Sequence, residues 1–157
     1  MKNIIFILII FFGAISTLKA DVKKWKLEQV GFLNIDRNEK DYGGFSGLLI
    51  KNAGTEALVV TDKSFFFVLE LRRDDNDILT GYSVIKKGRI LSSKGEHLNG
   101  RNTDSESIAM DANNNYYISF ESNHRIMMHT EVEGKGIFVP KHPMFRKLSM
   151  NKGIEAL

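Results

Sequence analysis

The chain has 157 residues, a length that fits one ordinary domain. It contains no cysteine, which excludes a disulfide framework, a thiolate nucleophile and a zinc–thiolate site. Its formal net charge is +3, from 22 basic and 19 acidic residues, and no basic run interleaved with aromatic residues points to a nucleic-acid partner.

Residues 1–20 have the pattern of an export signal. Lys2 gives a positive start, residues 4–15 are an apolar run, and residues 17–20 resemble a cleavage site before Asp21. The run is shorter than the roughly 20 residues that span a membrane, although an uncleaved N-terminal anchor is the alternative. We therefore expect a signal peptide at 1–20, a domain at 21–157, a bacterial periplasmic or secreted location, and no membrane contact beyond the signal.

Loss of this signal changes the charge of the mature chain. It removes Lys2 and Lys19, so that the basic count falls from 22 to 20 against the same 19 acidic residues. A net charge of +1 gives no electrostatic reason to expect a nucleic-acid partner.

The rest of the chain consists of short apolar runs, dense in β-branched and aromatic residues and separated by turn residues. In chain order, strands are expected at 25–35, 45–50, 57–61, 65–71, 78–90 (one strand or two), 108–110, 116–120, 125–132 and 136–139. Outside the signal no segment keeps a helical periodicity over ten or more residues. The predicted class is all-β.

An internal repeat organises these strands. Residues 45–62 match residues 105–121 as two strands joined by a turn, each copy continues into a third strand, and a third copy begins at 153–157. The copies start 60 and then 49 residues apart. Four-stranded propeller blades repeat at about 40–50 residues, with insertions in their loops. The prediction is a β-propeller with an incomplete ring of about two to three blades.

Acidic residues recur at strand starts and turns of this repeat. Aligning Ser46 with Glu106 puts Asp62 within one residue of Glu121 and Glu155 beside Glu106. Because innermost blade strands face a central channel, the acids of the repeat can converge there. The predicted metal ligands are Asp62, Asp104, Glu106, Glu121 and Glu155, with Ca²⁺ as the expected cation because it takes several oxygen ligands.

These acids also have plainer interpretations. Asp104 and Glu106 could end a strand or pair with Arg101 in a solvated loop. Asp62 could serve only as a turn residue. For Glu121 the alternative is a local ion pair with Arg125, an interaction that contributes little when exposed.

Five motifs follow one another along the chain: Gly43-Gly-Phe-Ser-Gly47, Val60-Thr-Asp62, Asp104-Ser-Glu106, Ser119-Phe-Glu-Ser-Asn-His-Arg125 and Asn151-Lys-Gly-Ile-Glu-Ala-Leu157. Together they resemble the phytase-like, "esterase-like activity of phytase" family of exported bacterial β-propellers, over roughly residues 25–157. Ser107 and Lys63 depart from the family pattern, which usually has Gly at the first position and Arg or a small residue at the second. The chain also stops in the first strand of a further blade, so it looks like an N-terminal portion whose missing C-terminal blades would be intramolecular partners.

The resemblance implies an exported hydrolase that acts on phosphate esters, with a small-molecule ester as its partner. On this interpretation Asp104, Glu106 and Glu121 are catalytic, and a bound cation offsets the phosphate charge and orients an attacking water. Arg125 and Arg101 are the expected phosphate-binding residues, since a guanidinium suits bidentate contact. The alternative is a non-catalytic exported propeller that binds a cation or a small ligand.

Overall fold

The computed structural model describes residues 26–29, 31–35, 44–150 and 153–157. The expected signal at 1–20 lies outside the described residues. Within the described part of the chain, the regular elements are strands and short 3₁₀ helices. None of the helices found there is long or apolar enough to cross a membrane.

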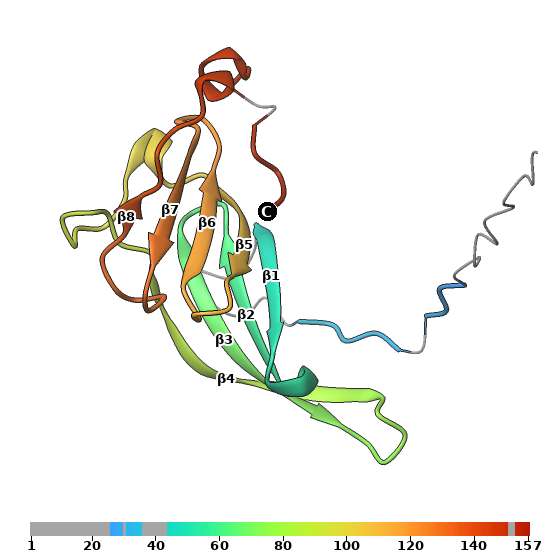
Figure 1. Ribbon diagram of the computed structural model, residues 1–157. Helices are drawn as coiled ribbons and strands as arrows, with labels where there is room; N and C mark the ends of the chain where they lie inside the picture. The colour runs from blue at the N-terminus through green and yellow to red at the C-terminus, as the bar shows by residue number, and fades with distance from the viewer. Residues whose placement is uncertain (1–25, 30, 36–43, 151–152) are drawn as a thin grey trace, which may run out of the picture.

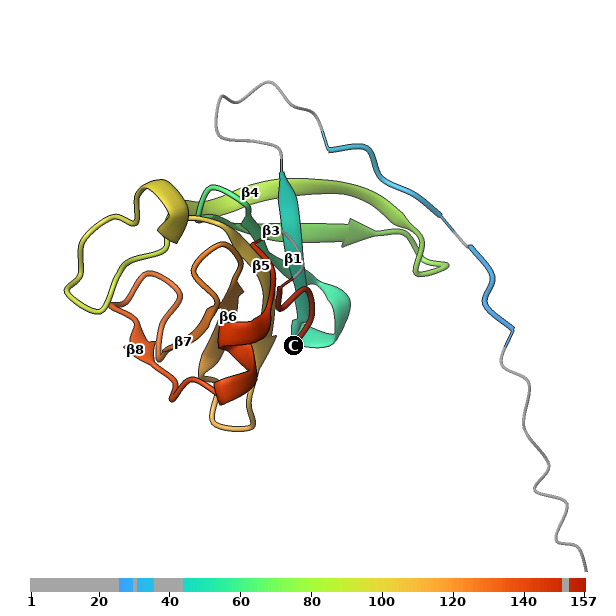
Figure 2. The same ribbon diagram turned by 90° about the horizontal axis from the view of Figure 1, so that it is seen from above.

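The strands form two four-stranded antiparallel sheets, each a simple meander. Blade 1 contains β1 (Phe45–Lys51), β2 (Glu56–Thr61), β3 (Phe65–Arg73) and β4 (Leu79–Arg89), and blade 2 contains β5 (Ser105–Met110), β6 (Tyr116–Phe120), β7 (Arg125–His129) and β8 (Ile137–Phe138). The 3₁₀ helices are η1 (Asn52–Gly54), η2 (Gly100–Asn102) and η3 (Pro143–Lys147). Strands β1 and β5 lie side by side, and β4 and β8 are the outer strands (Figure 1 and Figure 2). The all-β prediction is confirmed, and the sheets are consistent with propeller-type blades in a ring that does not close.

The two blades repeat the same local geometry at the start of their first strand. Each has a β-bulge there, between Phe45 and Gly47 in β1 and between Ser105 and Ser107 in β5. In each blade the residue before the first strand accepts a 2.8 Å backbone hydrogen bond from the residue after the second strand. Asp62 is therefore the structural equivalent of Glu121, and Ser46 is the equivalent of Glu106.

Two expected segments form no strand in the structure, and a third, expected as one strand or two, forms one. In the expected strand at 25–35, the described residues belong to no sheet, and Leu27 is 97% exposed. The run at 78–90 forms one strand, β4. The third copy at 153–157 forms no strand, although its ends are tied to blade 2: Ser119 Oγ donates to the Ile154 carbonyl at 2.8 Å, and the Leu157 amide donates to Ser107 Oγ at 3.2 Å. A strand needs a paired neighbour, and none of the described strands pairs with the described residues of 25–35 or with 153–157.

The main hydrophobic core lies between the blades. Its buried side chains are Leu58, Val60, Phe66, Ile90, Ile108, Ile118, Phe120, Met127 and Val132. A second buried cluster, around Phe67 and Leu69, covers the other face of blade 1. Because both faces of β2 are covered, residues 57–61 are all buried, whereas a half-exposed strand would alternate.

Polar contacts also join the blades. Ser46 Oγ donates to the Ser105 carbonyl at 2.5 Å, and Ser105 Oγ donates to the Thr61 carbonyl at 2.6 Å. At the other end of β1, Lys51 Nζ donates to the Tyr116 hydroxyl at 2.8 Å. The two serine bonds fix how the start of β5 lies against the end of β2, which is where the acidic residues are.

Close contact of the blades depends on the missing side chain of Gly47. A Cβ at this position would lie 2.7 Å from Val60 Cγ2 and 2.9 Å from the Ile108 backbone nitrogen. The second atom belongs to the backbone of the other blade and has no side-chain freedom with which to move away. We expect Gly47→Ala to lower the free energy of unfolding by about 1–3 kcal/mol, as overpacking does. Urea unfolding checks this, and an unchanged midpoint would show that the blades separate without cost.

Candidate functional site

Three carboxylates meet at one end of blade 2. One oxygen from each of Asp104, Glu106 and Glu121 lies within 4.8 Å of the others, and these three residues are called the acidic cluster. Asp104 directly precedes β5, Glu106 sits in the bulge of β5, and Glu121 directly follows β6. A bulge places two residues opposite one and so changes the direction of a side chain. The hairpin and its bulge therefore bring together three residues that span 18 positions of the chain.

Hydrogen bonds hold two members of the cluster in place. The Glu121 side chain is only 9% exposed, and its Oε1 accepts a 2.6 Å bond from the Gly153 amide. Asp104 Oδ2 accepts a 2.6 Å bond from Ser122 Oγ. The Glu121 amide donates to the Asp104 carbonyl at 2.8 Å. These donors orient the two carboxylates, and the second oxygen of each could bind a ligand.

The site has a strongly negative character, which is clearest at Glu106. The pKa of Glu106 is raised to about 7, first by burial and then by the nearby carboxylates of Asp104, Glu121, Glu155 and Asp62, in that order. The structure thus brings Asp62 and Glu155 within electrostatic reach of the acidic cluster. Glu106 is thus within electrostatic reach of the four other acids that the repeat singled out.

Asp62 supplies a test of whether these residues fit a cation. Its Oδ1 is buried and has no hydrogen-bond partner among the described residues. Gly44 leaves room for this carboxylate: its φ is +60°, and a Cβ there would lie 2.1 Å from Asp62 Oδ1. A buried oxygen without a partner costs free energy. Since a hard cation binds carboxylate oxygens, the donor set fits Ca²⁺ chemically.

The two arginines predicted to contact phosphate occupy different environments. Arg125 is 2% exposed, and its Nη1 and Nη2 donate to the carbonyls of Asn123 at 3.1 Å and Asn102 at 2.5 Å. Its guanidinium lies 3.8 Å from the ring centre of Phe120, and burial lowers its pKa to about 10. Among the ion pairs of the described residues, none joins Arg125 to Glu121. Arg101 is exposed on η2.

Arg125 therefore braces the two loops that carry Asp104 and Glu121. Its two carbonyl partners lie within two residues of those acids. Contact of either arginine with a phosphate stays a prediction.

Sequence reasoning missed three residues that support the site: Ser122, Gly44 and Gly153. Ser122 follows Glu121 directly, but its bond to Asp104 depends on the hairpin register, which a single sequence does not show. Gly44 stands in the first of the five motifs, where a glycine can indicate positive φ. Gly153 is needed for space, since a Cβ there would lie 2.6 Å from both Glu121 Cγ and His124 Nδ1.

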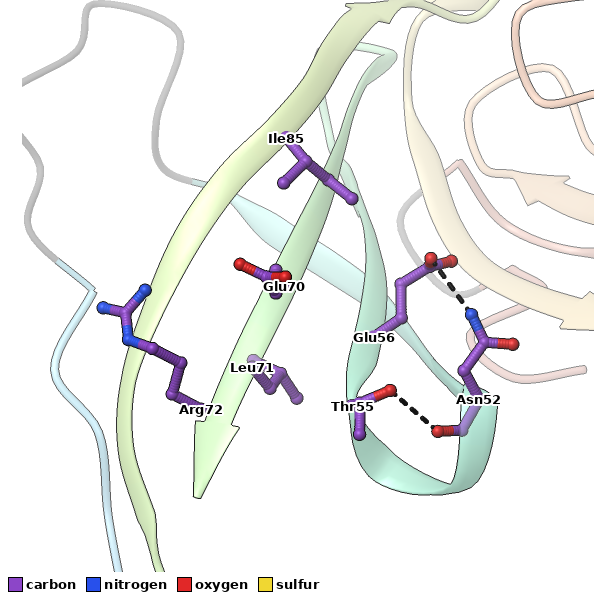
Figure 3. A pocket seen from close by; sticks show the side chains of 7 residues that line it. All are labelled: Asn52, Thr55, Glu56, Glu70, Leu71, Arg72 and Ile85. Atoms are coloured by element: carbon purple, nitrogen blue, oxygen red, sulfur yellow. Dashed lines mark hydrogen bonds between the residues drawn. The ribbon is translucent and has the colours of Figure 1, made fainter. Parts of the chain in front are cut away.

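A hollow of about 510 Å³ lies beside η1, where β1 ends. It is separate from the acidic cluster, which lies where β5 begins and contributes no residue to its lining. Its lining includes two carboxylates, Glu56 and Glu70, which are paired residues of β2 and β3 (Figure 3). Glu56 already has partners, because Asn52 Nδ2 donates to it at 3.2 Å and Lys51 Nζ lies 3.2 Å away. Among the described residues, none of the buried polar atoms without a hydrogen-bond partner belongs to the lining of this hollow.

The two antiparallel four-stranded sheets, with Asp62 and Glu121 at equivalent positions, are consistent with blades of the β-propeller type. A comparison with known families matches residues 40–157 to "Phytase-like: Esterase-like activity of phytase". The chain belongs to this Phytase-like family, which confirms the resemblance noted in its motifs and indicates a hydrolase-like domain. Comparisons with curated proteins and with solved structures gave no match.

Proposed function

We propose that this protein is an exported hydrolase of phosphate esters that uses a divalent cation, Ca²⁺ first among the candidates, held by the acidic cluster. The observation that carries the proposal is the convergence of three carboxylate oxygens within 4.8 Å. The unpartnered Oδ1 of Asp62 and the membership of a phytase-like family support it.

The residues of the cluster have separate tasks in this proposal. A bound cation would offset phosphate charge and make a coordinated water more acidic. Asp104 and Glu121, held by Ser122 and Gly153, are the fixed ligands. Glu106, with a carboxylate oxygen within 4.8 Å of theirs, takes the proton that the attacking water releases.

The outer residues complete the site. Asp62 and Glu155 add negative charge around Glu106, which strengthens the attraction for a divalent cation. Of the two arginines predicted to contact phosphate, Arg101 is exposed on η2 and is the one accessible to a phosphate. Export through residues 1–20 would place the protein in the periplasm or outside the cell, where Ca²⁺ is available as a ligand.

A non-catalytic role in cation binding is the second candidate. One observation favours it. Both terminal nitrogens of Arg125 already donate to backbone carbonyls, so this arginine has less capacity to bind a phosphate than the carboxylates have to bind a metal. On this alternative the acidic cluster binds Ca²⁺ but no ester is hydrolysed.

One experiment tests the proposal and separates the two candidates. Hydrolysis of a generic phosphomonoester and binding of Ca²⁺ are measured for the wild type, for Glu106→Gln, and for Glu131→Gln, which changes an exposed acid in the loop after β7. We expect Ca²⁺-dependent hydrolysis that falls by about 100-fold or more in Glu106→Gln, in line with the loss of an acid–base group, and is unchanged in Glu131→Gln. Calcium binding without hydrolysis supports the second candidate. Hydrolysis that ignores both the metal and Glu106 contradicts the proposed site.

A further inference from the structure

A second hollow, of about 250 Å³, lies next to the acidic cluster, between the β6–β7 turn and η3. We call it the η3 pocket, and its lining residues are Ser122, Asn123, His124, Lys141, Phe145, Arg146, Leu148 and Met150. Figure 1 shows η3 and the β6–β7 turn at the same end of blade 2. None of the motifs analysed in the sequence includes Lys141 or Arg146.

The charged groups of the η3 pocket are all of one sign. Lys141 and Arg146 are cationic, and no carboxylate is among the residues that line it. Lys141 is held in place, because its Nζ donates to Asn123 Oδ1 at 3.2 Å, while Asn123 Nδ2 donates to Asn102 Oδ1 at 2.9 Å. The pocket therefore has a positive potential beside a site of negative potential.

The remaining wall of the pocket is apolar. Phe145, Leu148 and Met150 line it from the side of η3. The backbone there is fixed by the Leu148 amide, which donates to the Phe145 carbonyl at 3.4 Å. The η3 helix is capped by His142, whose Nδ1 accepts a hydrogen bond from the Met144 amide at 3.2 Å. A wall of this kind can contact a carbon skeleton while the two cations contact a charged group.

The pocket is linked to the acidic cluster by one side chain. Ser122 lines the pocket and donates its hydroxyl hydrogen to Asp104 Oδ2. His124, two residues after Ser122, donates from Nε2 to the Ser149 carbonyl at 3.0 Å, which ties the β6–β7 turn to the segment after η3. A molecule held in the pocket would thus lie next to the carboxylates.

We infer that the η3 pocket binds the anionic group of a small organic molecule, with Arg146 and Lys141 contacting the anion and Phe145 contacting its apolar part. Phosphate, phosphonate and carboxylate groups share the required charge and acceptor oxygens. The binding stands on the pocket alone. Only its further meaning, that the pocket anchors the substrate of the acidic cluster, rests on the proposed function.

The test uses phenylphosphonate, which carries an anion on an aromatic ring and has no ester bond to hydrolyse. Binding to the full chain is followed by amide NMR shifts in the presence of EDTA, so that no metal is required. We expect shifts concentrated in 122–124 and 141–150. We expect Arg146→Ala to weaken binding by at least about fivefold and Lys141→Ala by at least about threefold, typical of lost charge-assisted contacts. Lys147→Ala is the matched control, since Lys147 belongs to η3 but does not line the pocket, and it should stay within twofold.

Other outcomes overturn the inference. Equal binding of benzyl alcohol would show that the anion contributes nothing. Shifts outside the two segments, or affinities that do not change in Arg146→Ala, would place the ligand elsewhere. Because EDTA removes divalent cations, phenylphosphonate binding that persists while Ca²⁺-dependent hydrolysis is absent would support the pocket and contradict the proposed function separately.

Discussion

Replacing Arg125 by methionine is expected to lower the free energy of unfolding by about 2–4 kcal/mol. Methionine keeps an apolar chain against Phe120 but donates no hydrogen bond. The carbonyls of Asn102 and Asn123 would lose the donors that the buried Arg125 now supplies. A hydrogen bond to a charged group contributes about 1.5–3 kcal/mol, and the loss of two is partly offset because methionine buries no charge.

The same change should weaken calcium binding, because the braced loops carry Asp104 and Glu121. Urea unfolding and Ca²⁺ titration are the measurements. Arg101→Met is the matched control, since Arg101 is exposed, and an exposed substitution shifts stability by about 0.5 kcal/mol or less. If Arg125→Met kept its stability and lost only phosphate affinity, the sequence-based assignment of Arg125 to phosphate would be preferred.

The sequence allowed prediction of the β class and the repeat because both depend on local information. Short runs rich in β-branched and aromatic residues predict strands, and the recurrence of residues 45–62 at 105–121 predicts equivalent blades. The sequence alignment of Ser46 with Glu106 places Asp62 one residue away from Glu121, whereas the structure makes the two acids equivalent. Pairing of the strands decides this detail, since β1 and β2 are longer than β5 and β6 and their turn is shorter.

The environment of each candidate residue was not accessible from the sequence. Arg125 and Arg101 are the same residue type near the same motifs, yet one is buried against Phe120 and the other is exposed. Burial depends on which loop packs over which strand, and a propensity or a spacing contains no such information. The η3 pocket was missed for the same reason, because Lys141 and Arg146 come together with the β6–β7 turn only in the folded chain.

Glu106 should make the metal-free protein less stable at neutral pH than it would be with glutamine at this position. Its folded pKa of about 7 lies above the ordinary value of 4.5. The proton is therefore bound more tightly in the folded state. The stabilisation that follows is complete below about pH 4.5, declines as the pH rises from there through about 7, and is absent above that.

Glu106→Gln removes this pH dependence. One pKa unit corresponds to about 1.4 kcal/mol, and because the carboxyl is only partly buried and screened by solvent, we expect a gain of about 1–2 kcal/mol for the variant at pH 8 in EDTA. As the pH falls from about 7 to 4.5, the difference between the variant and the wild type should shrink. Urea midpoints at a series of pH values measure it, with Glu131→Gln as the exposed control. A variant that is less stable than the wild type at pH 8 would show that Glu106 is held by favourable contacts.

Calcium should reverse this order of stability. A ligand at 100 times its dissociation constant stabilises a folded protein by about 2.7 kcal/mol, which exceeds the expected penalty of Glu106. With saturating Ca²⁺ at pH 8 the wild type should therefore become the more stable of the two, since the variant lacks one of the negative charges that attract the cation. The reversal separates a binding site from a chance meeting of acids, because carboxylates that merely repel one another would gain equally little from Ca²⁺ in both proteins.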